Sequence, residues 1–414
     1  MADLRPFRAY RPRKGMEDKI AALPYDVYSR EEAVKAVTDN PLSFLCIDRA
    51  ETQFGPEVDT YAPQVYDKAR ELLWKMVEEG LYVQDEIPCY YLYQLTMDGR
   101  SQTGIVACAS IDDYQNNIIK KHENTRADKE EDRIRHVDIC DAQTGPIFLA
   151  YRSEEALRTI IKETLQEEPL YHFVSDDGIG HKVYKISEPE QVERIRSAFA
   201  RYEAVYIADG HHRCASAVKV GMKRRGSGKD YNLEAAYNYF MAVLFPDEEL
   251  KILDYNRVVT DLNGLRKEEF LDKIKKCFDV TFVGFKPCKP SGKGVFGMYL
   301  EDTWYELKAH DELFGTDVVE GLDVSVLQKY LLDPILGIHD PKTDKRIDFV
   351  GGIRGLKELE RRVHTDMKVA FALYPTSISE LFAVADADRL MPPKSTWFEP
   401  KLRSGLFIHS LKSE

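Results

Sequence analysis

The sequence predicts a mixed α/β protein built from more than one domain. Three patterns lead to this prediction: an amphipathic helix pattern over residues 57–80, two β-prone runs joined by the turn residues Asp98-Gly99-Arg100, and an apolar strand that runs through a glycine turn into a helix near residue 210. A chain of 414 residues, 43% of them hydrophobic, can bury a large core, and its length indicates two or three domains.

Local signals predict the elements of the first part of the chain. Ser29-Arg30-Glu31-Glu32 has the form of a capping box, which marks the start of a helix. In the 57–80 pattern, Val65, Ala69, Leu72 and Leu73 share one face, and Gly80 ends the helix. The runs 89–95 and 104–110 are expected to pair as a hairpin. Further helices are predicted over about 126–137, 154–165 and 211–222, and strands over about 182–187 and 204–208.

The later part of the chain forms a second predicted region. Residues 239–245 have the composition of a buried strand, and after them we expect a helix near 267–277, a strand at 279–283 and a hairpin around 295–309. We therefore expect a main domain over 1–260, a second, smaller α/β region over 261–390 and a C-terminal segment over 391–414. That segment is rich in Pro, Lys and aromatic residues, so it is expected to pack back on the main domain.

Charge and composition narrow the class of partner. The net charge of -12 repels phosphate backbones at long range, so nucleic acid is not expected as a partner. No run of about 18 apolar residues occurs and the N-terminus is charged, so we expect no membrane span, no secretory signal and a cytoplasmic location. The cysteines are scattered and lack a CxxC pair, which predicts reduced thiols: Cys46, Cys89, Cys108, Cys140, Cys214, Cys277 and Cys288.

The segment Ala208 to Ala217 (ADGHHRCASA) is the strongest candidate for an active site. An apolar strand, a glycine turn and a helix start follow one another here, and unpaired backbone N–H groups and the helix dipole at such a start both favour an anion. Phosphate is the expected ligand, bound by Gly210, His211, His212 and Arg213. Gly210 allows positive φ, Arg213 can bind phosphate oxygens through two N–H groups, and the two histidines supply donors or proton carriers.

Two other interpretations of the same segment are open. Asp209 could simply cap a helix whose two histidines are exposed or hydrogen-bonded. The histidines could also bind a metal ion, but adjacent histidines rarely converge on one ion, and no HExxH motif or second His/Cys cluster supports this. We therefore predict no dedicated metal site.

A second candidate is the charge-rich segment Ile118 to His136. His122-Glu123 lies between a strand and a helix, and a carboxylate there could act as the general base that accepts a hydroxyl proton. Asn124 or Thr125 is expected to cap the helix, with Asp128 completing a Thr-x-x-Asp box.

The rest of this helix carries a dense pattern of charges. Arg126 with Glu130 and Glu131 with Arg135 form i,i+4 pairs, and the like charges of Lys129 and Arg133 indicate an anion between them. The apolar stripe is narrow, with Ala127, Ile134 and Val137. The alternative is a helix whose charged face is simply solvated.

Two further segments are candidates for substrate binding. Lys394, Ser395 and Thr396 resemble a phosphate or substrate clamp, although the glycine framework of a Walker A loop is missing. Near the N-terminus, Tyr25 and Asp26 could contact the substrate, with Asp26 as a ligand for Mg²⁺ or for a substrate amine. For each segment a structural loop is an equally good interpretation.

The motifs together resemble the domain-of-unknown-function family 1015, whose members have about this length. Each landmark alone is a weak signal, but the set is specific. The landmarks are Arg5-Pro6-Phe7-Arg8, Pro24-Tyr25-Asp26-Val27, Asn40-Pro41-Leu42-Ser43-Phe44, Lys121-His122-Glu123-Asn124-Thr125, Lys129-Glu130-Glu131-Asp132-Arg133, Ala208 to Arg213 and Met391 to Lys401.

The Asp-Gly-His-His-Arg turn and the His122-Glu123 element are also similar to the ParB and sulfiredoxin superfamily, which includes the ADP-dependent kinase that phosphorylates free serine. This resemblance implies a ParB/sulfiredoxin-like core in the main domain. It also implies that Asp209 to Arg213 hold nucleotide phosphates and that Glu123 is the base. As proton carriers near neutral pH, His211 and His212 are expected to be catalytic as well. Substrate contacts would then come from Tyr25, Asp26, His122, Thr125, Arg126, Lys129, Arg133, Lys394, Ser395 and Thr396.

The function expected from residues and resemblance together is phosphoryl transfer between an adenine nucleotide and a small hydroxylated metabolite. Free L-serine or O-phosphoserine is the best single choice, with ADP or ATP as co-substrate and Mg²⁺ to offset phosphate charge. The direction of transfer and the oligomeric state stay open. A nucleotide hydrolase or nucleotide-gated switch is the first alternative, and a non-catalytic regulator or DNA-binding protein of ParB type is the second.

Overall fold

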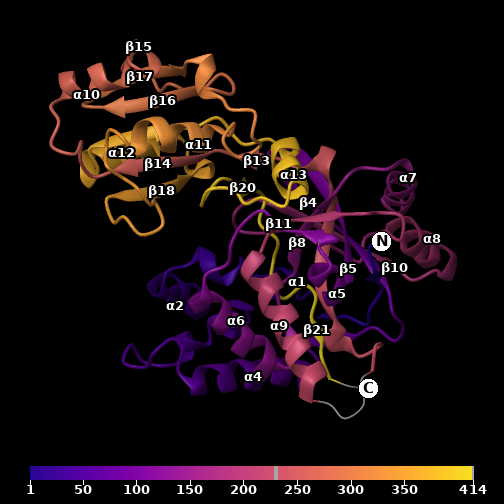
Figure 1. The fold of residues 1–414 in the computed structure, drawn as a ribbon. Coiled ribbons are helices and arrows are strands. Elements are labelled where there is room, and N and C mark those ends of the chain that lie inside the picture. The colour runs from indigo at the N-terminus through magenta and orange to yellow at the C-terminus, as the bar shows by residue number, and fades with distance from the viewer. Residues whose placement is uncertain (228–231, 413–414) are drawn as a thin grey trace. The chain divides into compact units, whose positions relative to one another are not determined.

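The computed structural model describes residues 1–227 and 232–412, which divide into two compact units (Figure 1). The first unit comprises Met1–Leu250 and Pro400–Glu414, and the second comprises Lys251–Glu399. The boundary between the units thus follows Leu250, whereas the sequence pattern predicted a boundary near residue 260. Residues 391–399, which we grouped with the C-terminal segment, are part of the second unit.

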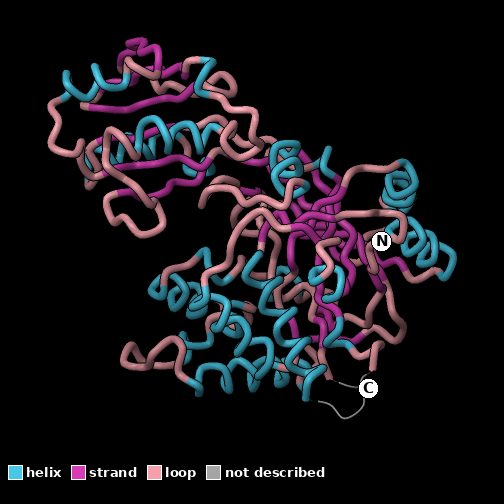
Figure 2. The backbone as a smooth tube through the Cα atoms, in the orientation of Figure 1, coloured by secondary structure: helices cyan, strands magenta, loops and turns pink. Residues whose placement is uncertain are grey.

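A nine-stranded mixed sheet forms the centre of the first unit among the residues described (Figure 2). Together with the helices around it, this sheet confirms the predicted α/β class. β12 runs parallel to β8 and antiparallel to β5, and β1 (Leu4–Arg5) pairs with β5 outside the main path. In order across the sheet the strands are β6 (Ile119–Lys120), β11 (Val205–Asp209), β8 (Ile147–Tyr151), β12 (Tyr239–Pro246), β5 (Arg100–Ser110), β4 (Tyr90–Met97), β10 (Gly180–Ile186) and β9 (Tyr171–Val174).

The hairpin between β4 and β5 forms as the sequence predicts. Met97 pairs with Arg100, so only Asp98 and Gly99 lie between the two strands. Both residues have positive φ, 51° and 77°, which a two-residue hairpin turn of this type requires and which Asp-Gly tolerates well. The turn therefore fixes the register of the central strands.

The two faces of this sheet are covered by different parts of the chain. On one face, alternate strand residues such as Leu92 and Ala107 join a core with Ile160 of α7 (Glu155–Thr164), Phe199 of α8 (Pro189–Phe199) and Val218 of α9 (His211–Ser227). On the other face, the rings of Tyr91 and Tyr93 contact Phe407, with centroids 5.1 and 6.2 Å apart. The C-terminal segment thus packs on the central strands of the first unit.

A group of helices stands beside the sheet and positions the candidate site. α4 packs against α6, and α6 in turn packs along α9. The capping box of α2 is confirmed, because the Ser29 hydroxyl accepts the Glu32 N–H and the Glu32 carboxylate accepts the Ser29 N–H. The remaining elements of this unit are α1 (Glu17–Ile20), α2 (Arg30–Asp39), α3 (Leu45–Asp48), α4 (Pro63–Glu78), α5 (Ile111–Gln115), α6 (Ala127–Cys140), β2 (Tyr10–Pro12), β3 (Tyr82–Gln84), β7 (Ala142–Gln143) and β21 (His409–Ser410).

The second unit has its own six-stranded antiparallel sheet among the residues described. The predicted helix, strand and hairpin of this region are confirmed as α10, β15 and the pair β16–β17. The sheet order is β15 (Phe278–Gly284), β17 (Thr303–Ala309), β16 (Val295–Leu300), β19 (Val369–Ala372), β14 (Tyr255–Val259) and β18 (Ile347–Gly351). The other elements are α10 (Lys267–Ile274), α11 (Asp323–Leu327), α12 (Leu356–Thr365), α13 (Ile378–Asp386), β13 (Ile252–Leu253) and β20 (Trp397–Phe398).

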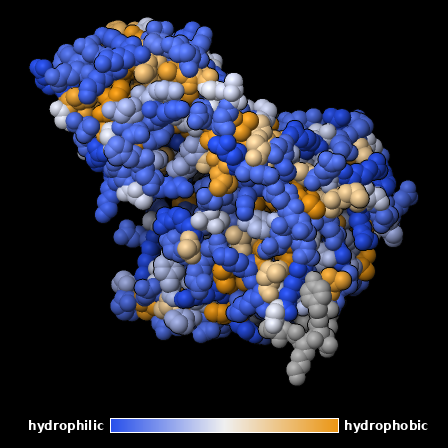
Figure 3. Space-filling model, viewed as in Figure 1, coloured by the Kyte–Doolittle hydropathy of each residue, from blue (hydrophilic) through white to orange (hydrophobic). Residues whose placement is uncertain are grey.

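The surface is polar over most of the face shown in Figure 3, with hydrophobic residues in small separate groups. In the part of the chain that the structure describes, no helix combines the length and the apolar character needed to cross a membrane. All seven cysteines are free, as the scattered spacing predicts.

Asp113 of α5 provides a test of the packing of the first unit. Its carboxylate is buried and accepts the Asp3 N–H at 2.6 Å, and burial raises the pKa of Asp113 to about 6. An acid with a raised folded-state pKa destabilises the fold when ionised, so its cost is present near pH 7 and is lost as pH falls below about 6. We expect Asp113→Asn to raise the free energy of unfolding by roughly 2–3 kcal/mol at pH 7 and by about half as much at pH 5. Urea unfolding at both pH values measures this.

The neighbouring Asp112 is the matched control. It forms an ion pair with Arg225 at 2.5 Å, and this hydrogen bond lowers the pKa of Asp112. Asp112→Asn should therefore destabilise the protein near neutral pH, the opposite sign. Equal changes in the free energy of unfolding from both substitutions would contradict the raised pKa of Asp113.

Candidate functional site

The phosphate turn, defined here as Asp209 to Arg213, connects β11 to α9. Gly210 has a φ of 88°, a conformation that glycine adopts readily, and its N–H donates to the Asp209 carboxylate at 2.7 Å. The Gly210 carbonyl then accepts the Cys214 N–H at 2.9 Å, the first helical bond of α9. The first N–H groups of a helix have no partner within it, so they are available to an anion at this end of α9.

Two cations flank the phosphate turn. Arg213 donates to the Pro146 carbonyl at 2.7 Å, and its guanidinium lies beside Gly210. Lys401 contacts the Asp209 carboxylate at 2.9 Å. Burial alone would raise the pKa of Asp209, but Lys401 and Arg213 outweigh it and hold the pKa well below its usual range. The aspartate is therefore ionised at neutral pH. We did not select Lys401 from the sequence, where its only signal is its place at the end of the Met391 to Lys401 landmark.

The loop between β6 and α6 brings His122 and Glu123 to the start of α9. The potential metal-binding atoms of His122, Glu123 and His211 all lie within 4.8 Å of one another. The two imidazole rings meet edge to face, with centroids 4.5 Å apart. Burial lowers the pKa of His122 to about 4 and that of His211 well below its ordinary value, so both rings are neutral at pH 7. The Glu123 carboxylate therefore lies next to the phosphate turn.

A second contact ties the same loop to α9. The Arg126 N–H donates to Nε2 of His212 at 2.9 Å. One ring nitrogen of His212 therefore contacts the loop. On the same helix, the Ser216 hydroxyl donates to the Glu130 carbonyl of α6 at 3.0 Å. These contacts fix the two candidate segments against each other.

The structure corrects several expectations about α6. Its N-cap is Arg126 without a side-chain cap, so neither Asn124 nor Thr125 caps the helix; the Thr125 hydroxyl instead donates to Glu130 at 2.7 Å. Arg126 pairs with Asp128 rather than with Glu130, which pairs with Lys219. The Glu131–Arg135 pair is confirmed.

The buried face of α6 is its charged face. Glu130, Asp132 and Arg133 are each 8% exposed or less, whereas Ala127 of the expected apolar stripe is exposed. Arg133 forms an ion pair with Asp132 at 2.8 Å, and Asp132 also accepts the Tyr66 hydroxyl of α4. Burial of paired charges is costly unless each is satisfied, so this helix is built around a polar cluster rather than a solvated face.

A cavity of about 320 Å³ lies along this charged face. It gathers four of the predicted substrate residues, Tyr25, Asp26, Lys129 and Arg133, together with acidic and basic groups that the sequence pattern did not select, notably Asp48, Arg49 and Glu51. The guanidinium of Arg133 stacks 3.9 Å from the centre of the Tyr25 ring. The size is typical of a site for a small metabolite.

A smaller cavity links this region to the phosphate turn. Its lining includes Tyr25 and Arg133 on one side and Arg213 on the other, with Gly145 and Ser404 between them. The cations Arg133 and Arg213 thus line the same small space. This places the metabolite-sized cavity and the phosphate turn next to each other.

Some predicted substrate residues do not have side chains among those that line these two cavities. The Arg126 side chain is 71% exposed and paired with Asp128, so only its backbone contacts the phosphate turn. Lys394, Ser395 and Thr396 belong to the second unit, where Lys394 lies 5.6 Å above the Tyr255 ring and the Ser395 hydroxyl donates to the Pro392 carbonyl.

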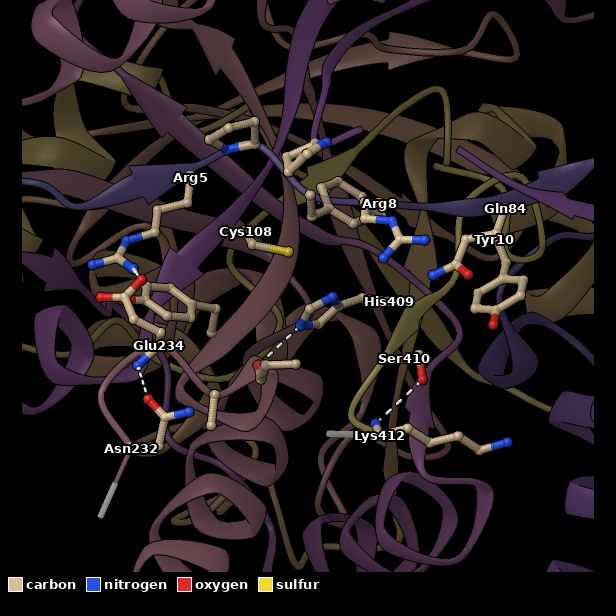
Figure 4. Close-up of a pocket in the computed structure, with 16 residues that line it drawn as sticks. Arg5, Arg8, Tyr10, Gln84, Cys108, Asn232, Glu234, His409, Ser410 and Lys412 are labelled. Carbon is tan, nitrogen blue, oxygen red and sulfur yellow. Dashed lines mark hydrogen bonds and ion pairs between the residues drawn. The ribbon is translucent and has the colours of Figure 1, made fainter. Parts of the chain in front are cut away.

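Another cavity, of about 640 Å³, lies elsewhere in the first unit (Figure 4). No residue of the phosphate turn lines it. Its cations include Arg5, which is engaged by Asp3 and Glu234, and the His409 ring contacts the Ala236 carbonyl at 3.0 Å. We therefore place the candidate site at the phosphate turn.

The structure is a mixed α/β protein with two cations, Arg213 and Lys401, at a strand–turn–helix junction. The chain belongs to the family described as "Protein of unknown function (DUF1015)", whose model matches residues 4–325. No curated protein matches the chain.

Solved structures resemble it only distantly. Free serine kinase in complex with AMP is 15% identical with a TM-score of 0.36, covering 73% of this chain and 91% of that one. SbnI with a C-terminal truncation from Staphylococcus aureus is 11% identical with a TM-score of 0.40, covering 75% and 90%. A conserved hypothetical protein from Pyrococcus furiosus is 15% identical with a TM-score of 0.35, covering 73% and 94%. Likeness at this level carries no argument about activity.

Gly210 offers a direct test of the turn geometry. A Cβ atom here would lie 3.1 Å from Nε of Arg213, and the φ of 88° is strained for any residue with a side chain. We expect Gly210→Ala to cost roughly 1–3 kcal/mol of unfolding free energy and to displace Arg213. Chemical denaturation measures the cost. Gly226→Ala, near the end of α9 where a Cβ meets nothing within 4 Å, is the control and should not destabilise the protein.

Proposed function

We propose that this protein is a phosphotransferase that moves a phosphoryl group between an adenine nucleotide and a small hydroxylated metabolite, with free L-serine as the metabolite. The observation that carries the proposal is the position of Glu123. Its carboxylate lies at the start of α9, beside the phosphate turn. The α6 helix that follows its loop lines a metabolite-sized cavity with mixed charges. A base, a phosphate site and an acceptor cavity are the parts that phosphoryl transfer needs.

The phosphate turn is suited to the nucleotide phosphates. The helix start supplies N–H donors, and Arg213 supplies a charge-assisted, fork-shaped contact. Carboxylate oxygens are the hard donors that Mg²⁺ accepts, and the ionised Asp209 offers them in the phosphate turn, so the residues present fit a magnesium–nucleotide complex. When bound, Mg²⁺ would offset the charge of the phosphates. Lys401 keeps Asp209 ionised and in place for this role.

The cavity along α6 is suited to a zwitterionic acceptor. Arg133 and Lys129 offer positive charge for a carboxylate, and Asp26 and Asp48 offer negative charge for an ammonium group. Glu123 would accept the hydroxyl proton as the oxygen attacks the phosphoryl group, or return it in the reverse direction. Serine carries a carboxylate, an ammonium group and a hydroxyl. Among metabolites with these three groups, the motif resemblance to free serine kinases selects serine.

The test is to incubate the purified protein with L-serine and ATP or ADP, and with O-phosphoserine and ADP, always with Mg²⁺. Formation of O-phosphoserine or of serine supports the proposal. No product in any combination would exclude serine as the metabolite. Nucleotide loss that ignores added serine would instead support a hydrolase or a nucleotide-gated switch, and DNA binding that weakens steeply with salt would support a regulatory protein.

A further inference from the structure

Two histidines and a carboxylate from distant parts of the chain converge beside the phosphate turn. His122 and Glu123 come from the β6–α6 loop, whereas His211 is the first residue of α9. Their nitrogen and oxygen ligand atoms lie within 4.8 Å of one another. Metal–ligand distances of about 2.0–2.2 Å keep two ligands of one ion within about 4.4 Å of each other, so the three atoms are a few tenths of an ångström from the spacing around a single ion, a shift that side-chain rotation can supply.

His211 shows an independent sign of a missing ligand. Its side chain is only 6% exposed, and its Nε2 atom has no hydrogen-bond partner among the residues that the structure describes. A buried polar nitrogen without a partner destabilises a fold, so such atoms call for an explanation. A bound ion provides the partner. In addition, the backbone of Ile207 forms a hydrogen bond with the His122 ring, as the outer contacts of metal-binding histidines commonly do.

We propose that His122, Glu123 and His211 form a binding site for one divalent transition-metal ion of the class of Zn²⁺, Mn²⁺ or Co²⁺. Two imidazoles favour this class over Mg²⁺, which prefers oxygen ligands. Three protein ligands leave coordination positions open, facing the phosphate turn. From the sequence we expected no metal site, because the adjacent residues His211 and His212 rarely bind the same ion. The structure instead brings His211 together with His122, and the proposal replaces that expectation.

The proposal does not depend on phosphotransferase activity. A carboxylate has two oxygens, so Glu123 can bind the ion with one and accept a proton with the other. The ion would also hold the β6–α6 loop against the start of α9, fixing Glu123 beside the phosphate turn. Binding can therefore be tested without nucleotide or serine, and either proposal can fail alone.

The experiment uses the untagged full chain, stripped of metal with a chelator and titrated with Co²⁺, followed by visible absorbance and calorimetry. We expect one Co²⁺ per chain, displaced by Zn²⁺ but not by excess Mg²⁺. His211→Gln and Glu123→Gln should each weaken binding by roughly 100-fold or more, at least as much as losing an outer-shell contact. His172→Gln, on an exposed position of β9, should leave it unchanged.

Three results would overturn the site: no stoichiometric Co²⁺ in the wild-type chain, displacement by Mg²⁺ as easily as by Zn²⁺, or unchanged affinity in the folded variants. His211 is buried, so circular dichroism must show that its variant folds. If it does not, Glu123→Gln decides, since Glu123 is only half-buried and glutamine has the same shape. His212→Gln separates the trio from the adjacent histidine and should retain the ion.

Discussion

Replacing Glu123 with glutamine is expected to lower kcat for phosphoryl transfer by roughly 10²- to 10⁴-fold, the usual contribution of a positioned general base. Glutamine keeps the shape of the side chain but cannot accept the hydroxyl proton. The nucleotide Kd, measured by calorimetry with Mg²⁺ present, should change far less than kcat, because the N–H groups of α9 and Arg213 remain. Steady-state kinetics with serine as the varied substrate gives the kcat and KM values.

Glu131→Gln is the control for this experiment. Glu131 lies on the same helix as the candidate site, but it is exposed and pairs with Arg135. Its substitution should leave kcat within about twofold, as expected for an exposed ion pair. Full turnover by Glu123→Gln would exclude Glu123 as the base while leaving the phosphate turn intact as a nucleotide site.

Removing the guanidinium of Arg213 should have the second largest effect. We expect Arg213→Ala to weaken ADP and ATP binding by roughly 100-fold, because two charge-assisted hydrogen bonds to phosphate are lost at about 1.5–3 kcal/mol each and part of the loss is offset by water. Arg213→Lys should recover only part of the affinity, since an ammonium group cannot make the two-pronged contact. Calorimetric titration of all variants with each nucleotide gives the ratios.

Arg224→Ala controls for damage to α9. Arg224 lies near the other end of the helix, where it pairs with Asp138 and Asp141. Its removal should lower stability without changing nucleotide affinity. If both arginine variants lost affinity equally, the effect would come from the helix as a whole, and the phosphate turn would not be the nucleotide site.

Features that depend on neighbouring residues in the chain could be predicted from the sequence. The hairpin at Asp98-Gly99 follows from the positive φ that these two residues tolerate, and the capping box of Ser29 and Glu32 from a reciprocal bond three residues apart. The strand, turn and helix around Gly210 also formed as predicted, since a glycine between an apolar run and small residues determines that geometry locally.

Features that depend on residues far away in the sequence could not be predicted. Asp132 and Arg133 look like parts of a solvated helix face, but Tyr66 and Tyr25, far away in the sequence, cover them. The Thr125 cap was wrong because Glu130 takes its hydroxyl. The grouping of His122 with His211 arises only when β6 pairs with β11, a contact that no local pattern encodes.

The dependence of Asp209 on Lys401 has a consequence for the biosynthesis of this protein. The first unit is interrupted by Lys251–Glu399 and is completed only by the residues from Pro400 onward. Those residues supply both the ammonium partner of Asp209 and the Phe407 ring on the central strands. A nascent chain, or a fragment cut after residue 399, therefore carries every residue of the phosphate turn, Arg213 included, yet lacks the Lys401 ammonium that pairs with Asp209. Ligand binding should therefore be acquired only once the residues from Pro400 onward have been synthesised.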